Sequence, residues 1–125
     1  RGFKGFFDRV HKGKNQLCLI AKLDDKVVGF LGIHRFGEPH SHTGDVGVMV
    51  HPEYQRRCIG TILLKAGIEL AKEKGFKRLE ADTLASNKAM RGTAEKAGFQ
   101  LEGTKRKAIN MHRLLEDEAL YAILL

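Results

Sequence analysis

A stretch in the middle of the chain, HPEYQRRCIGTILLKAG from His51 to Gly67, carries residue types that suit anion binding. Apolar residues from Ile59 onward recur at helical spacing, so Arg56 and Arg57 stand just before a predicted helix start. A helix start carries unpaired N–H groups and a partial positive charge, and a glycine such as Gly60 lets backbone approach an oxyanion closely. The stretch therefore predicts a phosphate-binding helix start. The alternative is that the glycine is an ordinary turn residue and the arginines are solvated.

The same stretch argues against two classes of nucleotide-binding protein. It has a single glycine and no Walker lysine, unlike the P-loop of nucleoside triphosphatases, and the GxGxxG pattern of dinucleotide-binding folds is absent. The net charge still favours a polyanionic or phosphate-bearing partner, because 22 Lys plus Arg against 15 Asp plus Glu give +7. A surface that merely happens to be basic is the alternative reading.

Length and composition predict one globular domain over residues 1–125. No apolar run approaches the roughly 20 residues that a membrane helix needs, so we expect no membrane span. Cys18 and Cys58 stand apart, without CxxC or histidine-rich spacing. They predict neither a zinc site nor a disulfide framework, and they fit a reducing, cytoplasmic compartment. The first residue is Arg1 rather than Met, so we expect the N-terminal end to be trimmed or incomplete.

Hydrophobic spacing predicts a mixed α/β domain. Phe3, Phe6, Phe7 and Val10 follow helical spacing, so an amphipathic helix is expected at the start. The other predicted elements are strands at 17–23 and 26–36, a loop at 37–44, a strand at 45–50, a helix from Ile59 that Gly75 closes, and strands at 76–84, 101–110 and 119–125.

A second helix is predicted between the strands at 76–84 and 101–110. Asn87 is its expected N-terminal cap, and Gly98 stops it. Gly92 lies inside it, where a glycine costs about 1 kcal/mol. This glycine either makes room near a ligand or is a tolerated defect.

At these positions the sequence resembles the GNAT N-acetyltransferases. The family's acetyl-CoA signature is Q/R-x-x-G-x-G/A, and it follows a strand and a V-x-P-like turn. The stretch VMVHPEYQRRCIGTILL is similar to this signature. LEADTLASNKAM and AEKAGFQLEGTKRKAI resemble the family's next strand, its asparagine-led helix and its EKxGF ending. The likeness covers roughly residues 18–125 and is closest to the ribosomal-protein N-terminal acetyltransferases. It implies an α/β (α+β) GNAT fold, a mixed and mostly antiparallel twisted sheet flanked by helices, with the family's first strand missing before Phe3.

The resemblance implies acetyl-CoA as cosubstrate and no metal. The helix start would meet the pyrophosphate, and backbone of the preceding strand would pair with the pantetheine arm. The strand after the helix splays away in the family and leaves a slot where thioester and amine meet. Asn87 stands where family members contact the cofactor. It is also the expected N-terminal cap of the second helix. The implied cofactor-binding residues are Val48, Met49, Val50, Gln55, Arg56, Arg57, Cys58, Ile59, Gly60, Thr61 and Asn87.

Two positions depart from the family pattern. Cys58 replaces the first motif glycine, so its amide remains available while its side chain takes up space. A thiol at a helix start beside arginines could suggest an acetyl-cysteine intermediate. This position nevertheless faces the pyrophosphate, far from the thioester, which argues against a covalent intermediate.

Ala94 stands where many relatives have a tyrosine that protonates the departing thiolate, so Tyr54, Tyr121 or water are the candidate substitutes.

The resemblance also suggests where the base that accepts the amine proton lies. Asp82 stands where some relatives carry a catalytic glutamate, and Asp45 is close to another position used as a base. Glu80 shares the face of Asp82 by the two-residue period of a strand. Each can instead be an ordinary exposed or ion-paired carboxylate. Histidines around the 37–44 loop are further candidates for the acceptor side, with plain solvation as the alternative: His34, His40 and His42.

The sequence thus predicts an N-acetyltransferase that moves an acetyl group from acetyl-CoA to a primary amine by direct attack in a ternary complex. The acceptor is a small-molecule amine or a protein N-terminus, and a homodimer is an open expectation. One alternative is a GNAT-like domain that binds CoA but turns over weakly, which Cys58 and Ala94 favour. Another is a basic nucleic-acid or ribosome-associated module using Lys105 to Ile109, which the absence of Trp and of an aromatic RNA-binding motif disfavours.

Overall fold

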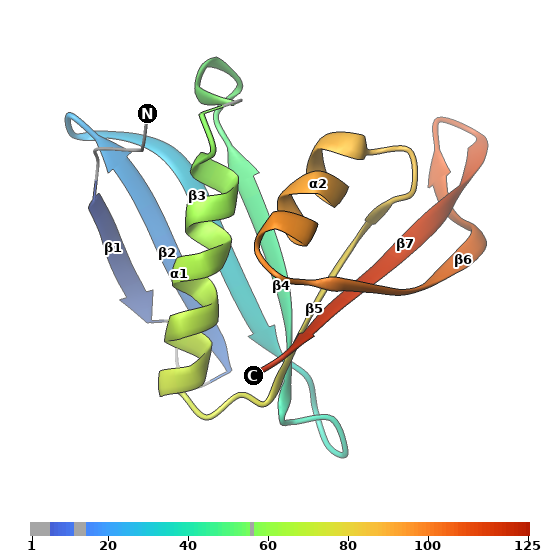
Figure 1. Ribbon diagram of the computed structural model, residues 1–125, viewed down its shortest axis with the longest axis horizontal. Coiled ribbons are helices and arrows are strands. Elements are labelled where there is room, and N and C mark those ends of the chain that lie inside the picture. Colours follow the sequence, from blue (N-terminus) through green and yellow to red (C-terminus); the bar gives the residue numbers. More distant parts are fainter. Residues whose placement is uncertain (1–5, 12–14, 56) are drawn as a thin grey trace.

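The computed structural model describes residues 6–11, 15–55 and 57–125 and shows a mixed sheet of seven strands with two α-helices (Figure 1). The strand order is β1-β2-β3-β4-β5-β7-β6, antiparallel throughout except for the parallel pair β4–β5. The expected α+β architecture, a mixed and mostly antiparallel sheet flanked by helices, is therefore confirmed. The elements are β1 Phe6–His11, β2 Gln16–Leu23, β3 Lys26–Arg35, β4 Thr43–Val50, the short 3-10 helix η1 Pro52–Tyr54, α1 Ile59–Glu73, β5 Arg78–Leu84, α2 Lys88–Lys96, β6 Gln100–Met111 and β7 Leu114–Leu124.

The start of the chain differs from the sequence prediction. The expected helix through Phe6, Phe7 and Val10 is wrong, because these residues belong to β1, the edge strand that pairs antiparallel with β2. Only a few apolar positions supported the helix, and a short apolar run does not separate a helix from a strand. The open edge of β2 supplies backbone partners, and this pairing with the next strand of the chain outweighs the helical spacing. Phe3 and the expected absence of a family strand before it lie outside the described residues.

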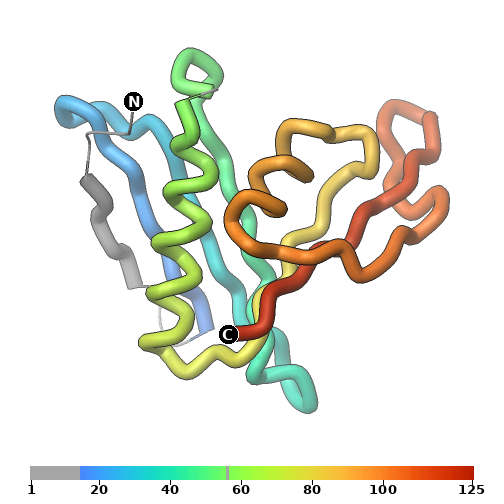
Figure 2. Tube along the Cα trace, in the orientation of Figure 1, coloured from blue at the N-terminus to red at the C-terminus, as the bar shows by residue number. Residues whose placement is uncertain are grey.

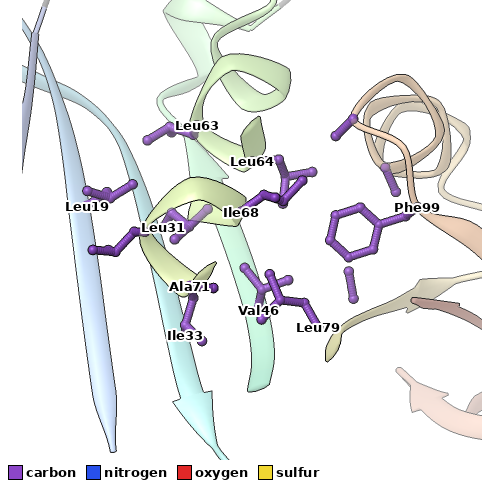
Figure 3. Packing of buried hydrophobic residues seen from close by; sticks show 14 of the residues in the cluster. Leu19, Leu31, Ile33, Val46, Leu63, Leu64, Ile68, Ala71, Leu79 and Phe99 are labelled. Carbon is purple, nitrogen blue, oxygen red and sulfur yellow. The ribbon is translucent and has the colours of Figure 1, made fainter. Parts of the chain in front are cut away.

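The core lies between one face of the sheet and the two helices. α1 covers β2, β3 and β4, and its buried side chains interdigitate with alternate residues of these strands (Figure 3). On the strands, odd-numbered positions of β3 from Gly29 onward and even-numbered positions of β4 point to the helices, as the two-residue period requires. The cluster includes Leu19, Leu31, Val46, Leu63, Leu64, Ile68, Ala71, Leu79 and Phe99.

Glycines inside the two helices serve different purposes. A Cβ built on Gly67 in α1 would come within 2.8 Å of the Leu31 side chain, so this glycine permits close packing of helix and sheet. A Cβ on Gly92 in α2 would meet nothing within 4 Å, and Gly92 is not among the residues that line the cleft described below. Gly92 therefore does not make room for a ligand in that cleft.

We expect Gly92→Ala to raise the free energy of unfolding by about 0.5–1 kcal/mol, the gain in helix propensity from Gly to Ala. Gly67→Ala is the matched control, since it makes the same change in the other helix. We expect it to lower the free energy of unfolding by about 1 kcal/mol or more, because the buried Leu31 has little room to move. Urea denaturation of both variants is the measurement, and equal effects of the two would contradict this assignment.

Candidate active site

The central feature of the fold is the separation of β4 from β5. The two parallel strands pair only at their first residues, Thr43 to Asp45 with Arg78 to Glu80. Beyond that point β4 continues to Val50 paired with β3 alone, and the chain trace shows the two strands diverging into a V (Figure 2). The expected splay after the helix is present. The edge of β4 that faces the opening therefore carries backbone groups without a sheet partner.

A cleft of about 800 Å³ lies along this free edge, between the start of α1 and α2. It gathers nine of the residues that the sequence assigned to the cofactor: Val48, Met49, Val50, Gln55, Cys58, Ile59, Gly60, Thr61 and Asn87. Arg57 is described but does not line the cleft, and Arg56 lies outside the described residues. The sequence analysis missed as lining residues Pro52, Tyr54, Ala89, Met90, Thr93 and Lys96. Four of these share one face of α2, so the helical period counted from Asn87 was the available signal.

The start of α1 has an unusual backbone at Cys58. This N-cap residue is in the left-handed region, at φ 62° and ψ 15°, and its side chain makes no capping hydrogen bond. The right-handed helix begins one residue later, at Ile59. Left-handed backbone favours glycine. The family glycine at this position therefore has a conformational reason in this chain, and Cys58 occupies that conformation at a cost.

Gly60 keeps the cleft open where three elements meet. A Cβ at Gly60 would lie 3.4 Å from the methyl group of Thr93 on α2 and 3.7 Å from the side chain of Val50 on β4. Both neighbours line the cleft, so a longer side chain at this position would fill the space between them. The glycine brings the first turn of α1 into direct contact with the cleft, which suits a bulky anion held by backbone N–H groups.

Side-chain contacts hold the two ends of the cleft in place. The Nε2 atom of Gln55 donates to the carbonyl oxygen of Val50 at 3.2 Å, which fastens the loop to the end of β4. The Oδ1 atom of Asn87 accepts from the N–H of Met90 at 3.0 Å, so its predicted role as the cap of α2 is confirmed. The Asn87 cap uses only the oxygen of the side-chain amide, and the nitrogen remains a hydrogen-bond donor at the cleft wall.

Tyr54 marks the outer end of the cleft. Its ring lies 5.1 Å from the guanidinium carbon of Arg57 and 5.3 Å from the Nζ atom of Lys26. Such cation–π contacts orient both cations beside the start of α1. Arg57 thus lies next to the cleft and adds positive charge to its mouth, although it does not form the wall.

The candidate carboxylates lie on the other face of the sheet. Leu79 and Ala81 of β5 are buried toward the helices, so the intervening Glu80 and Asp82 point away from them. Asp45 on β4 pairs with Glu80 in the parallel register and shares that face. The opening between β4 and β5 therefore separates the cleft on one side from the carboxylates on the other.

Asp82 has the most perturbed carboxyl group of this face. Although the Asp82 side chain is exposed to solvent, desolvation by the protein atoms around it raises its pKa to about 6. The negative charges of Glu118, Glu80 and Asp45 add to the shift, in that order. A hydrogen bond from the backbone N–H of Tyr121 acts against it. Glu118, on β7, was missed by the sequence analysis because nothing local connects it with Asp82.

The other two base candidates have different surroundings. Burial, with Glu80 and Glu118 as further causes, raises the pKa of Asp45, while the facing His34 lowers it. Glu80 accepts two hydrogen bonds from Arg78, at 2.9 Å and 3.0 Å, and is held in an ion pair. A carboxylate engaged in this way is a poorer proton acceptor, so the surroundings favour Asp82 over Glu80.

The histidines are not gathered at this opening. His40 and His42 belong to the loop before β4, at the end of the strand where β4 and β5 are still paired, and both are exposed. The carbonyl oxygen of His42 accepts from Lys77 and Arg78 at that closed end. The sequence analysis suggested that His40 and His42 border the site of the acceptor amine. Their position at the closed end of the β4–β5 pair does not agree with that suggestion. His34 is the exception, since it faces Asp45 across β3 and β4.

Comparison with known proteins agrees with this arrangement. The family model for "Acetyltransferase (GNAT) family" matches residues 2–99. The chain belongs to the GNAT acetyltransferase family. It is 31% identical over 91 residues to the L-amino acid N-acetyltransferase AaaT of Escherichia coli, covering 71% of this chain and 56% of that protein. The chain spans 56% of the length of the first curated relatives it matches.

Solved structures of GNAT-type enzymes share the fold. A ribosomal-protein-alanine N-acetyltransferase from Brucella melitensis superposes with a TM-score of 0.84 at 26% identity, covering 88% of this chain and 69% of that one. The yncA protein of Salmonella typhimurium, solved with acetyl-CoA, gives 0.85 at 20% identity over 90% of this chain and 66% of that one. The predicted resemblance to the ribosomal-protein acetyltransferases is thus confirmed.

Within the GNAT fold, neither Ala94 nor Tyr121 offers an acid to the cleft. Ala94 is 1% exposed and belongs to the core. The hydroxyl of the buried Tyr121 accepts from Nε of Arg91 at 3.0 Å and donates to Glu95 at 2.7 Å. These two partners lie on the side of α2 opposite its cleft-lining residues. Tyr121 therefore holds α2 against β7 through these hydrogen bonds. Tyr54 is the tyrosine that lines the cleft.

Two further expectations concern the whole described chain. No helix in residues 6–11, 15–55 and 57–125 is both long and apolar enough to cross a membrane. Within those same ranges, no three His, Cys, Asp or Glu side chains gather as a metal-binding group. Cys18 is buried and Cys58 exposed, and both are free thiols.

Proposed function

We propose that the chain is an N-acetyltransferase that moves the acetyl group of acetyl-CoA to a primary amine by direct attack in a ternary complex. The observation that carries the proposal is the opening between β4 and β5, which lies between a cleft suited to the cosubstrate and a carboxylate with a pKa near 6. One ligand can approach from each side and meet the other at the opening. The bound acetyl-CoA of the Salmonella typhimurium neighbour supports this use of the fold.

The residues around the cleft fit an elongated ligand with phosphates at one end. Backbone N–H groups at the start of α1, with Gly60 open to the cleft and Arg57 at its mouth, would hold the pyrophosphate. The unpaired edge of β4 at Val48 and Val50 would hydrogen-bond the pantetheine amides. Asn87 and Thr93, on the opposite wall, would orient the same arm. Acetyl-CoA supplies an acetyl thioester, whose carbonyl needs polarisation by a hydrogen-bond donor.

Asp82 would accept the proton that the amine must lose. An alkylammonium has a pKa near 10, so a base is needed to bring the nucleophile to its neutral form. With a pKa near 6, Asp82 is ionised at neutral pH and more basic than an ordinary carboxylate. The proton passes to its carboxylate directly or through water. The departing thiolate is protonated by water or by Tyr54, because Ala94 cannot serve and Tyr121 is engaged elsewhere.

The acceptor is a small-molecule amine or a protein N-terminus. Relatives are named for an L-amino acid and for the alanine of a ribosomal protein, and both present an α-amino group. A cytoplasmic location fits acetyl-CoA and two free thiols. Ala94 and Cys58 favour one second candidate, a CoA-binding domain that turns over weakly. Thiol release from acetyl-CoA in a screen of amines separates the two functions.

Binding of the cosubstrate is the first test. We expect acetyl-CoA and CoA to bind with similar affinity, because the proposed contacts involve the phosphates and pantetheine that both share. The affinity of both should fall with added salt, since exposed ionic contacts are screened as the Debye length shrinks. Isothermal titration calorimetry at low and high salt measures this. Absence of binding at low salt would overturn the proposed function.

A further inference from the structure

The face of the sheet that carries Asp82 has one more carboxylate in a position to act on it. Asp82 on β5 pairs with Leu120 on β7, and Glu118 is two residues before Leu120. Residues two apart on a strand share a face, so Glu118 is the diagonal cross-strand neighbour of Asp82, at about 7–8 Å. No sequence motif joins these two residues, because Glu118 comes from the last strand of the chain.

Ion pairs on this face involve other carboxylates than Asp82 and Glu118. Glu80 is ion-paired with Arg78, which also binds Glu102 at 2.6 Å. In the described part of the chain, neither Asp82 nor Glu118 forms an ion pair. The groups that face Asp82 from the neighbouring strands are Asp45 on β4, with His34 beyond it on β3, Glu80 with Arg78 on its own strand, and Glu118 on β7, with Lys105 opposite it on β6.

We propose that Glu118 is a positioning residue for acetyl transfer, whose negative charge, not held in an ion pair, makes Asp82 a stronger proton acceptor. This inference rests on the proposed function, in which Asp82 receives the proton of the amine. Two carboxylates on one face resist carrying two negative charges, and a proton arriving at Asp82 relieves that repulsion. The raised pKa of Asp82, with Glu118 as the largest charge contribution, agrees with this geometry. Glu118 itself need not touch the acceptor.

The test is the titration of the Asp82 carboxyl carbon by NMR, together with the pH dependence of kcat/KM. We expect Glu118→Gln to lower both the NMR midpoint and the acid limb of the rate profile by about half a pH unit, the effect of one unit charge at this separation in a water-like dielectric. Glu118→Asp should restore most of the shift, because it keeps the charge. Glu116→Gln is the matched control, since Glu116 lies on the same strand and face, hydrogen-bonded to Ser86, and is not among the charges that act on Asp82.

The two measurements separate failure of this inference from failure of the proposed function. The NMR titration needs neither cosubstrate nor acceptor. An Asp82 midpoint that is unchanged in folded Glu118→Gln, or that moves equally in Glu116→Gln, overturns the role of Glu118. A midpoint that moves while the rate profile stays in place overturns its part in acetyl transfer. A wild-type chain that acetylates no amine at any pH overturns the proposed function, whatever the titration shows.

Discussion

Asp82→Asn is expected to lower kcat for acetyl transfer by about 10²-fold or more, the usual loss when a general base is removed. Affinity for acetyl-CoA should barely change, because Asp82 faces away from the cleft that would hold it. In the wild type, kcat/KM should fall as the pH drops through about 6, where the carboxylate becomes protonated. Steady-state rates with any accepted amine, together with calorimetric titration of acetyl-CoA, measure both effects.

The same substitution should act on stability in the opposite direction. The pKa of Asp82 is about 6 in the folded protein and near 3.8 in the unfolded chain, so folding favours its protonated form. This contribution to stability is fully present below about pH 3.8 and is lost as the pH rises through about 6. Asp82→Asn should therefore be more stable than the wild type at pH 7 to 8, and the gain should shrink toward pH 4.

Near-normal turnover in Asp82→Asn would transfer the role of base to Asp45, Glu80 or solvent.

Alkylation of Cys58 is expected to abolish measurable cosubstrate binding, whereas Cys58→Gly should bind acetyl-CoA at least as well as the wild type. The thiol is exposed and lines the cleft beside the start of α1, so a bulky adduct would occupy the phosphate end. Saturating CoA should slow the reaction of the thiol by covering it. Cys18 is an internal control, because it is buried and should resist the same reagent.

Cys58→Gly should in addition raise the free energy of unfolding by about 1 kcal/mol. Left-handed backbone costs a non-glycine residue about 1–2 kcal/mol, and relief of that cost outweighs the greater entropy of glycine in the unfolded chain. Urea denaturation and turnover of the variant are the measurements. Loss of activity in Cys58→Gly would show that the thiol takes part in the chemistry, which the geometry of the cleft opposes.

Local sequence was enough to predict most of the elements, and the resemblance to the GNAT family indicated most of the residues that line the cleft. The helix from Ile59, the helix capped by Asn87 and the strands of the middle of the chain are found close to where their periods place them. Nine predicted cofactor residues gather on one cleft because they belong to one continuous segment, from β4 to the first turn of α1, plus a helix cap. Residues that are close in the sequence stay close in space in such a strand–loop–helix unit, so their gathering does not depend on the rest of the fold.

Properties that depend on partners distant in the chain were decided only by the tertiary structure. Residues 6–11 form a strand because β2 offers an open edge, although their spacing predicted a helix. The φ of 62° at Cys58, which makes glycine the favoured residue there, is likewise a property of the folded backbone. Sheet register brings Glu118 beside Asp82, and packing of α2 removes Tyr121 from the cleft. Periodicity tells which face a residue occupies, whereas neighbours across strands are set by register, which is fixed only when the whole sheet assembles.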